Sequence, residues 1–218
     1  MTDWPDLARH FGAVYTAALT DVLDGLGLER QTLPAEIAPL APGMRLAGPA
    51  FAVEGRPHPG NPYEPSIRRI LEMLGAVPAH HVAVYQTNDF SCAQFGELSA
   101  VSLRARGAVG VVLEGGTRDV DFIVQEGFPV FCRYATPQDS VPRWECVAWG
   151  HEVEIGGVRV ATGDYVVGDA DGVAVIPAAL VEQVLAEAEA VVGTENAVRD
   201  AVRQGIAPLD AYERFGKF

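Results

Sequence analysis

The chain has 218 residues and a mass of 23.2 kDa, which predicts one domain over residues 1–218 with a core large enough to fold independently. Its net charge of −13 leaves no bulk basic surface, so we expect no nucleic-acid partner and no membrane-surface role. No stretch approaches the roughly 20 apolar residues of a transmembrane span, and the N-terminus lacks the pattern of a signal peptide. The three cysteines are widely spaced, which favours reduced thiols and a cytoplasmic location.

The first part of the chain favours helices and strands separated by Pro-rich loops. The predicted segments are helices within 4–26 with a cap near Thr20-Asp21, a loop over 28–43, two strands with a break within 44–55, a loop over 56–66 and a helix over 67–77.

A strand–helix–strand unit is predicted at the centre of the chain. The segments VAVYQ (82–86) and AVGVVLEGG (108–116) are typical of buried strands, and ELSAVSLRARG (97–107) is typical of a helix. Such a crossover joins parallel strands, so the end of each strand and the start of the helix share one edge. Open α/β sheets usually bind ligands at that edge.

The remaining segments complete an α/β pattern. They are a helix over 120–127, a strand over 129–135, an irregular segment over 136–150, short strands with Gly turns over 151–176, and two helical stretches over 178–205 that break near Gly193-Thr194. The sequence therefore predicts an α/β fold with a parallel crossover unit.

Two short motifs are expected to meet at the crossover edge. Gly96-Glu97 opens the central helix, and Arg118-Asp119 follows the second strand after a gap of twenty residues (98–117). Arg118 provides a planar fork of donors that suits an oxo-acid oxygen. Either motif alone is more often a capping element or a solvated turn, so their convergence carries the functional interpretation.

The backbone N–H groups and the two carboxylates of the motifs suit a small oxo acid and a divalent metal. Backbone N–H groups at the helix start, near Gly96, Leu98 and Ser99, could hold a carboxylate. Asp119 is a hard oxygen ligand for Mg²⁺ or Mn²⁺, and Glu97 could bind the metal through water or act as a base. Such a metal stabilises an enolate, which cleavage of a carbon–carbon bond next to pyruvate requires.

The segment FGELSAVSLRARGAVGVVLEGGTRDVDFI (95–123) resembles the core of the 4-hydroxy-4-methyl-2-oxoglutarate aldolase family, which includes the regulator-of-ribonuclease-E-like (RraA-like) proteins. The family signature is Gly-Asp/Glu, twenty residues and Arg-Asp, and the chain matches it in full. The resemblance extends over most of the chain. It implies a compact, single-domain α/β/β layered fold of the RraA-like (swivelling) type, assembled as homotrimers or hexamers.

The resemblance also implies an activity. The chain would be a class II pyruvate aldolase, a metal-dependent carbon–carbon lyase that cleaves 4-hydroxy-2-oxo acids such as 4-hydroxy-4-methyl-2-oxoglutarate and decarboxylates oxaloacetate. Asp119 would ligate Mg²⁺ or Mn²⁺, and Glu97 would act through metal-bound water. Arg118 would bind the oxo acid and steady the enolate, and the N–H groups after Gly96 would take the carboxylate.

Other residues are weaker candidates. The resemblance implies a glutamate from a neighbouring subunit near the metal, for which Glu195 is the first candidate and Glu36 the second. The stretch 55–74 departs from the family in its Pro and Arg content and could shift specificity. Arg68 and Arg69 could bind a distal carboxylate, although an adjacent Arg pair is more often a solvated helix face.

Several alternatives stay open at this point. Cys92 lies near Gly96, but no clear His partner is close in sequence, which favours a small buried residue over a nucleophile. Asp89 could tune the site or serve a turn. The competing function is a non-catalytic, ribonuclease-inhibitor-like binding protein. The natural substrate, the choice between cleavage and decarboxylation, the identity of the acid and base, and the choice between trimer and hexamer are not determined.

Overall fold

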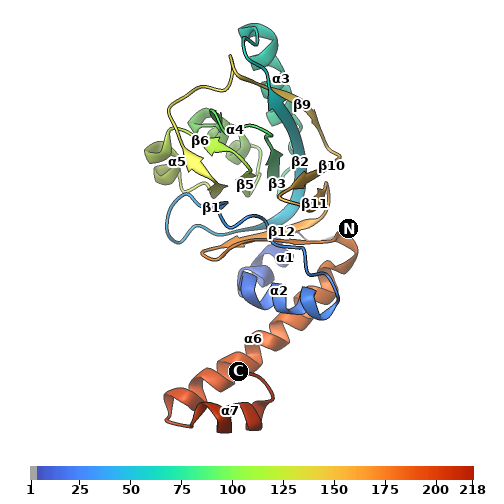
Figure 1. Ribbon diagram of the computed structural model, residues 1–218, viewed down its shortest axis with the longest axis vertical. Coiled ribbons are helices and arrows are strands. Elements are labelled where there is room, and N and C mark those ends of the chain that lie inside the picture. Colours follow the sequence, from blue (N-terminus) through green and yellow to red (C-terminus); the bar gives the residue numbers. More distant parts are fainter. Residues whose placement is uncertain (1–3) are drawn as a thin grey trace.

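The computed structural model describes residues 4–218 and has a mixed α/β architecture (Figure 1). The main sheet is formed by β1 (Ala38–Pro39), β2 (Leu46–Pro57), β3 (Val82–Gln86), β5 (Gly110–Leu113), β7 (Val130–Cys132), β9 (Trp144–Trp149), β12 (Tyr165–Asp169) and β13 (Gly172–Ile176). The strand order is β1-β7-β5-β3-β2-β12-β13, and β9 pairs with β2. The sheet curves until β1 and β13 contact each other, so it is nearly closed and barrel-like.

Two small sheets accompany the main one. One is the hairpin of β10 (Glu152–Ile155) and β11 (Val158–Ala161), and the other contains the parallel strands β4 (Ala93–Phe95), β6 (Gly116–Thr117) and β8 (Tyr134–Ala135). The helices are α1 (Trp4–Phe11), α2 (Thr16–Gly25), α3 (Tyr63–Ala76), α4 (Glu97–Ala105), α5 (Val120–Glu126), the 3₁₀ turn η1 (Ala178–Leu180), α6 (Val181–Arg203) and α7 (Pro208–Phe215).

Helices cover the sheet through two separate buried clusters. Leu74, Leu103 and Ile123, from α3, α4 and α5, share one cluster with Tyr85 and Leu113 of the sheet. A second cluster joins α1, α2 and the first half of α6 to β12 and β13. The strand residues 82–85 are buried throughout, which explains why these four positions of β3 are all apolar rather than alternately apolar and polar.

The α/β class and the parallel crossover are confirmed. β3 and β5 are parallel neighbours, with Val84 opposite Val112, and α4 connects them. The edge at the carboxyl ends of β3 and β5 differs in one respect from the prediction. Each of β3, β5 and β7 is followed by a short strand of the β4-β6-β8 sheet, which carries the chain beyond the main sheet before the site loops begin.

Three predicted boundaries are wrong. The N-terminal helices are separated at residues 12–15, so Thr20 and Asp21 lie inside α2 and cap nothing. β2 is one continuous strand, because its first half pairs with β12 and its second half with β3. The irregular segment 136–150 contains β9, which pairs with β2.

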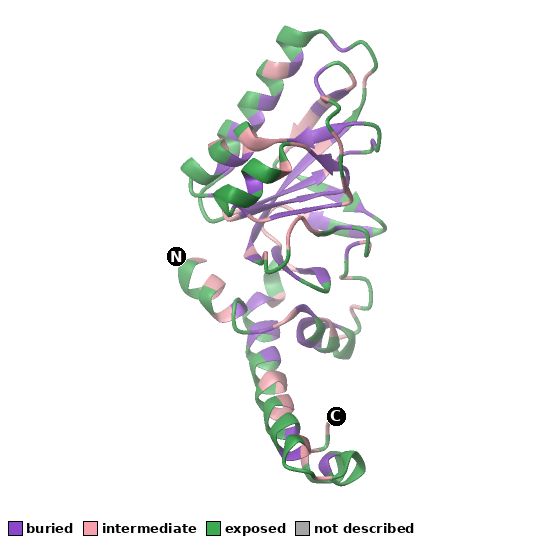
Figure 2. Ribbon diagram, turned by 90° about the vertical axis from the view of Figure 1, so that its left-hand side faces the viewer, coloured by how far each residue is buried: buried purple, intermediate pink, exposed green. Residues whose placement is uncertain are grey.

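The C-terminal helices form an arm that extends away from the sheet (Figure 1). The predicted break near Gly193-Thr194 is wrong, because α6 is continuous and the Thr194 hydroxyl donates a hydrogen bond to the Ala190 carbonyl one turn earlier. The outer half of the arm is largely exposed (Figure 2), including Leu209 and Tyr212 of α7. Among residues 4–218, no helix is both long and apolar enough to cross a membrane.

Candidate functional site

Three loops meet where the parallel strands β4, β6 and β8 end. Gly96-Glu97 follows β4, Arg118-Asp119 follows β6, and Asp139 lies a few residues beyond β8. Backbone hydrogen bonds align the three strands, because Arg118 N–H donates to the Phe95 carbonyl and Thr136 N–H donates to the Thr117 carbonyl, both over 3.0 Å. The loops line one pocket of about 350 Å³, whose opposite wall is α3.

Asp119 links the two predicted motifs directly. Its backbone is left-handed, with φ of 59°, a conformation that Asp tolerates better than most residues. Asp119 stands at the start of α5 but makes no side-chain capping bond there. Its Oδ2 instead accepts a hydrogen bond of 3.1 Å from the N–H of Glu97, the first residue of α4. The carboxylate is therefore turned into the pocket, toward the neighbouring helix.

Gly96 is required because of the space around it rather than its backbone angles. A Cβ atom built at this position would lie 2.7 Å from Asp119 Oδ2 and 3.2 Å from Arg118 Cγ. Real Cβ contacts do not reach 2.7 Å, so a larger residue would displace the carboxylate from its bond with Glu97. The glycine thus lets the two motifs approach each other.

If the pocket is an active site, Gly96→Ala is expected to lower kcat/KM by about 100-fold, because a displacement of about 1 Å in a catalytic group has an effect of that size. Thermal unfolding should change little, since the displaced carboxylate lies on the surface of the pocket. Gly193→Ala is a matched control, because apart from its chain neighbours and the adjacent backbone of its own helix no atom lies within 4 Å of the added Cβ. Activity of Gly96→Ala equal to that of the control would show that this close approach is unimportant.

Arg118 lies between two carboxylates. Its Nε is 3.7 Å from Asp119 Oδ2, and one terminal nitrogen is 3.4 Å from Asp139 Oδ1. The Arg118 side chain is 38% exposed, so its remaining donors face the open pocket. Sequence reasoning missed Asp139, because it lies in a segment that was predicted to be irregular and no local motif marks it.

The first turn of α4 offers free backbone donors. Within residues 4–218, the N–H groups of Leu98 and Ser99 make no hydrogen bond, as expected for the start of a helix. The Glu97 carboxylate likewise has no hydrogen-bond or ion-pair partner in the described chain. Both donors and the free carboxylate lie at the pocket, so the predicted residues Gly96, Glu97, Leu98 and Ser99 are brought together with Arg118 and Asp119.

Asp89, Cys92 and Gln94 form a buried support behind the pocket. Asp89 accepts hydrogen bonds from the Gln94 amide at 2.9 Å and the Ser91 hydroxyl at 2.8 Å, and Gln94 Oε1 accepts one from Gly116 N–H. Burial, and then the hydrogen bond to Asp89, raise the pKa of the Cys92 thiol to about 12. A neutral thiol is a poor nucleophile, so Cys92 is structural.

Glu195 and Glu36 do not line this pocket. Glu195 lies inside the continuous helix α6 on the arm, 3.5 Å from Lys217 Nζ, and not just after a helix break near Gly193-Thr194. Glu36 Oε2 is 3.5 Å from Arg133. Both therefore remain candidates only as residues of another copy of the chain.

The oxygen-rich pocket fits Mg²⁺ or Mn²⁺ better than zinc. Glu97, Asp119 and Asp139 offer carboxylate oxygens, and no imidazole or available thiolate lines the pocket in the described chain. Residues 4–218 contain no group of three or more His, Cys, Asp or Glu side chains placed to hold a metal ion together. Mg²⁺ accepts such a sparse site, because it binds through one or two carboxylates and keeps several waters.

The chain belongs to the RraA-like family, whose model, described as Aldolase/RraA, matches residues 16–175. The matched region contains every loop of the pocket described above. Family membership confirms the resemblance of residues 95–123, and it assigns the class of protein without deciding between an enzyme and a binding protein.

Individual relatives agree with this placement. A protein of Halalkalibacterium halodurans with the name "Putative 4-hydroxy-4-methyl-2-oxoglutarate aldolase" is 29% identical over 95% of this chain and 93% of its own. Protein DlpA of Legionella pneumophila is 28% identical over 97% of this chain, which spans only 34% of DlpA. The Streptomyces coelicolor structure of RraAS2, an unusual member of the RNase ES inhibitor RraA protein family, has a TM-score of 0.80 and 26% identity, covering 89% of this chain and 96% of that one.

Proposed function

We propose that the chain is a divalent-metal-dependent carbon–carbon lyase that releases pyruvate from 4-hydroxy-2-oxo acids and decarboxylates oxaloacetate. The observation that carries this proposal is the contact between the two motifs, in which Asp119 Oδ2 accepts the N–H of Glu97 while Arg118 faces the same pocket. Acids, a cation and free helix N–H groups are then within one small volume. The name of the Halalkalibacterium relative supports the same reaction class.

Each residue of the pocket has a role in this proposal. Asp119, with Glu97 acting through water, would hold Mg²⁺ or Mn²⁺, which supplies electrophilic polarisation of the 2-oxo group when bound. The N–H groups of Leu98 and Ser99 bind the substrate carboxylate at the positive end of α4. Arg118 donates to the 2-oxo oxygen and stabilises the negative charge that develops there.

Proton transfer falls to the free carboxylate of Glu97. Glu97 has no partner in the described chain, which leaves it available to take the proton from the 4-hydroxyl group, directly or through water. Asp139 holds Arg118 at 3.4 Å and so keeps the guanidinium over the pocket. Loss of the 4-hydroxyl proton accompanies cleavage of the bond between C3 and C4, and C3 then takes a proton from water to give pyruvate.

The first test is pyruvate release from oxaloacetate and from 4-hydroxy-4-methyl-2-oxoglutarate, in Mg²⁺ and again in EDTA. We expect release in Mg²⁺ that falls to the uncatalysed rate in EDTA and returns when Mn²⁺ is added, because the carboxylates alone cannot polarise the oxo group. The ratio of the two rates ranks cleavage against decarboxylation. Release that EDTA leaves unchanged would exclude a metal-dependent lyase.

Assembly into a homotrimer or hexamer completes the proposal. The arm carries Glu195 away from the pocket of its own chain and exposes Leu209 and Tyr212 (Figure 2). A neighbouring copy that packs on this arm would bury those side chains. Glu195 of the arm could then lie beside Asp119 of the neighbouring copy. Light scattering of the purified chain measures the copy number.

The alternative function is a binding protein that inhibits a ribonuclease without chemistry of its own. One observation favours it: the Streptomyces neighbour belongs to a family described as RNase ES inhibitors. Capture of a purified endoribonuclease by the chain, together with no pyruvate release from either acid, would select this alternative.

A further inference from the structure

We infer that the pocket selects 2-oxo acids whose distal end is uncharged and apolar, rather than acids with a second carboxylate. The inference rests on the proposed function for the 2-oxo acid head group, which binds near Arg118. It concerns the other end of the substrate, which must lie against the wall of the pocket opposite the site loops.

The charge of the pocket disfavours a second carboxylate. Arg118 is the single cationic side chain that lines it within the described chain, beside the acids Glu97, Asp119 and Asp139. Arg118 already has two carboxylate neighbours, at 3.7 and 3.4 Å. In the proposed function both Arg118 and the divalent cation serve the head group, so a distal carboxylate would find no free cationic partner in the pocket and would lose hydration without compensation.

The wall opposite the loops is apolar. Ile67, Ile70, Leu71 and Leu74 line the pocket at the i, i+3, i+4 and i+7 spacing of one helical face, and Phe122 of α5 adds an aromatic ring. Leu71 and Phe122 are 57% and 60% exposed, so an apolar substrate tail would cover surface that is otherwise in water. Burial of that surface favours an alkyl group over a charged one.

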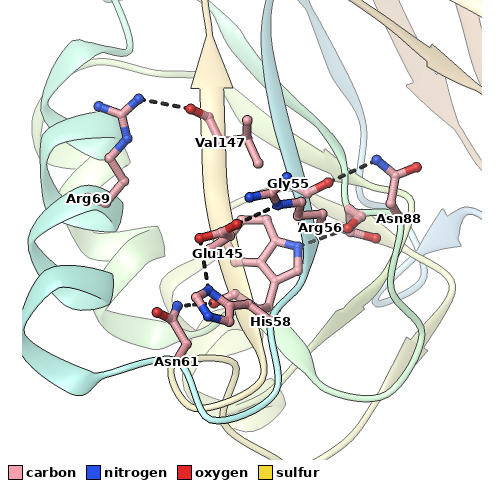
Figure 3. Close-up of polar contacts among 10 residues, drawn as sticks. Gly55, Arg56, His58, Asn61, Arg69, Asn88, Glu145 and Val147 are labelled. Atoms are coloured by element: carbon pink, nitrogen blue, oxygen red, sulfur yellow. Dashed lines mark hydrogen bonds and ion pairs between the residues drawn. The ribbon is translucent and has the colours of Figure 1, made fainter.

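The two arginines of the same helix point elsewhere. Arg69 donates to the Val147 carbonyl on β9 at 2.9 Å, as Figure 3 shows, and its guanidinium lies 4.1 Å from the Trp149 ring centroid. Arg68 pairs with Glu64 at 2.7 Å on the exposed face of α3. Neither lines the pocket. Arg68 therefore fits the alternative of a solvated helix face, and the lining of this pocket gives no support to the binding of a distal carboxylate by Arg68 or Arg69.

A matched pair of substrates isolates the distal group. In 4-hydroxy-4-methyl-2-oxopentanoate a methyl group replaces the distal carboxylate of 4-hydroxy-4-methyl-2-oxoglutarate. Cleavage of the former breaks the C3–C4 bond, moves the hydroxyl proton to a base, leaves the electron pair on C3 for protonation, and gives pyruvate and acetone without any redox partner. We expect kcat/KM, measured as substrate consumed in Mg²⁺, to be at least about tenfold higher for the methyl compound.

A substitution in the wall tests the cause of the preference. Leu71→Arg places a cation on the apolar face, so it should raise kcat/KM for the dicarboxylate relative to the methyl compound by about tenfold. Leu71→Gln is the control, because it removes the same apolar surface without adding charge. Leu71 lies on the exposed wall and has no role in the proposed chemistry.

Calorimetric binding of two acids that cannot be cleaved, 4-methyl-2-oxopentanoate and 2-oxoglutarate, separates this inference from the proposed reaction. Tighter binding of 4-methyl-2-oxopentanoate would support the inference. If no substrate then yields pyruvate, only the proposed reaction is wrong. Equal or higher kcat/KM for the dicarboxylate, or tighter binding of 2-oxoglutarate, would overturn the inference. Pyruvate release in that case would still support the proposed reaction.

Discussion

Asp119→Ala is expected to abolish pyruvate release at every Mg²⁺ concentration, the largest effect of any single substitution in the pocket. The substitution removes the carboxylate that would ligate the metal, and with it the acceptor for the N–H of Glu97. A water-rich Mg²⁺ site has few protein ligands, so the loss of one leaves too little affinity to be recovered by excess metal. Pyruvate release and the binding of Mn²⁺, measured by its paramagnetic resonance signal, should be lost together.

Two further variants make the Asp119 result specific. Asp119→Asn keeps a side chain that tolerates the left-handed backbone at φ of 59°, so it separates the lost charge from backbone strain. Asp121→Ala removes an exposed acid in the first turn of the same helix and should keep near-normal turnover. Metal-dependent activity of Asp119→Ala within a few-fold of Asp121→Ala would rule out Asp119 as the metal ligand.

Arg118→Ala is expected to lower kcat by about 10²–10³-fold, the size of effect seen when a donor to a developing oxyanion is removed. KM should also rise, because the guanidinium contributes to binding of the oxo acid before reaction. Arg118→Lys should recover little, since an ammonium group cannot reproduce a planar fork held between Asp119 and Asp139. Steady-state kinetics with oxaloacetate in Mg²⁺ measure both effects.

Arg104→Ala is the matched control for Arg118. Arg104 lies on α4, is 55% exposed and pairs with Glu126 outside the pocket, so its removal changes surface charge by the same amount. Exposed pairs of this kind contribute little to stability, and turnover should be nearly unchanged. If Arg118→Ala and Arg104→Ala had the same kcat, the proposed role of Arg118 in catalysis would be wrong.

Features with a local cause were predictable from the sequence. The run 82–85 is apolar because both faces of β3 are covered there, and α4 (Glu97–Ala105) begins directly after Gly96 and ends shortly before Gly107. The crossover rule then placed the start of α4 and the loop after β6 at one edge. Gly96-Glu97 and Arg118-Asp119 could therefore be paired before any contact between them was known.

Features that depend on distant pairing were not predictable. Asp139 reaches Arg118 because β8 extends the small parallel sheet, and nothing in the neighbouring residues marks that role. β9 forms shortly after Pro137 and Pro142 because it pairs with β2, where Gly55 makes room for the buried ring of Trp144. In α6, a glycine costs about 1 kcal/mol relative to alanine, which is too little to interrupt a long helix held by its neighbours.

The main chain of the small β4-β6-β8 sheet sets the shape of the pocket, whereas the side chains that follow its strands set the chemistry. Main-chain hydrogen bonds hold its strands in register, and those bonds are independent of the side chains that follow at positions 97, 119 and 139. Exchange of these side chains therefore changes reactivity while the scaffold persists. The side chains of the pocket can therefore be exchanged by a few point mutations while the folded surface around them is kept, whether that surface serves a reaction or a binding partner.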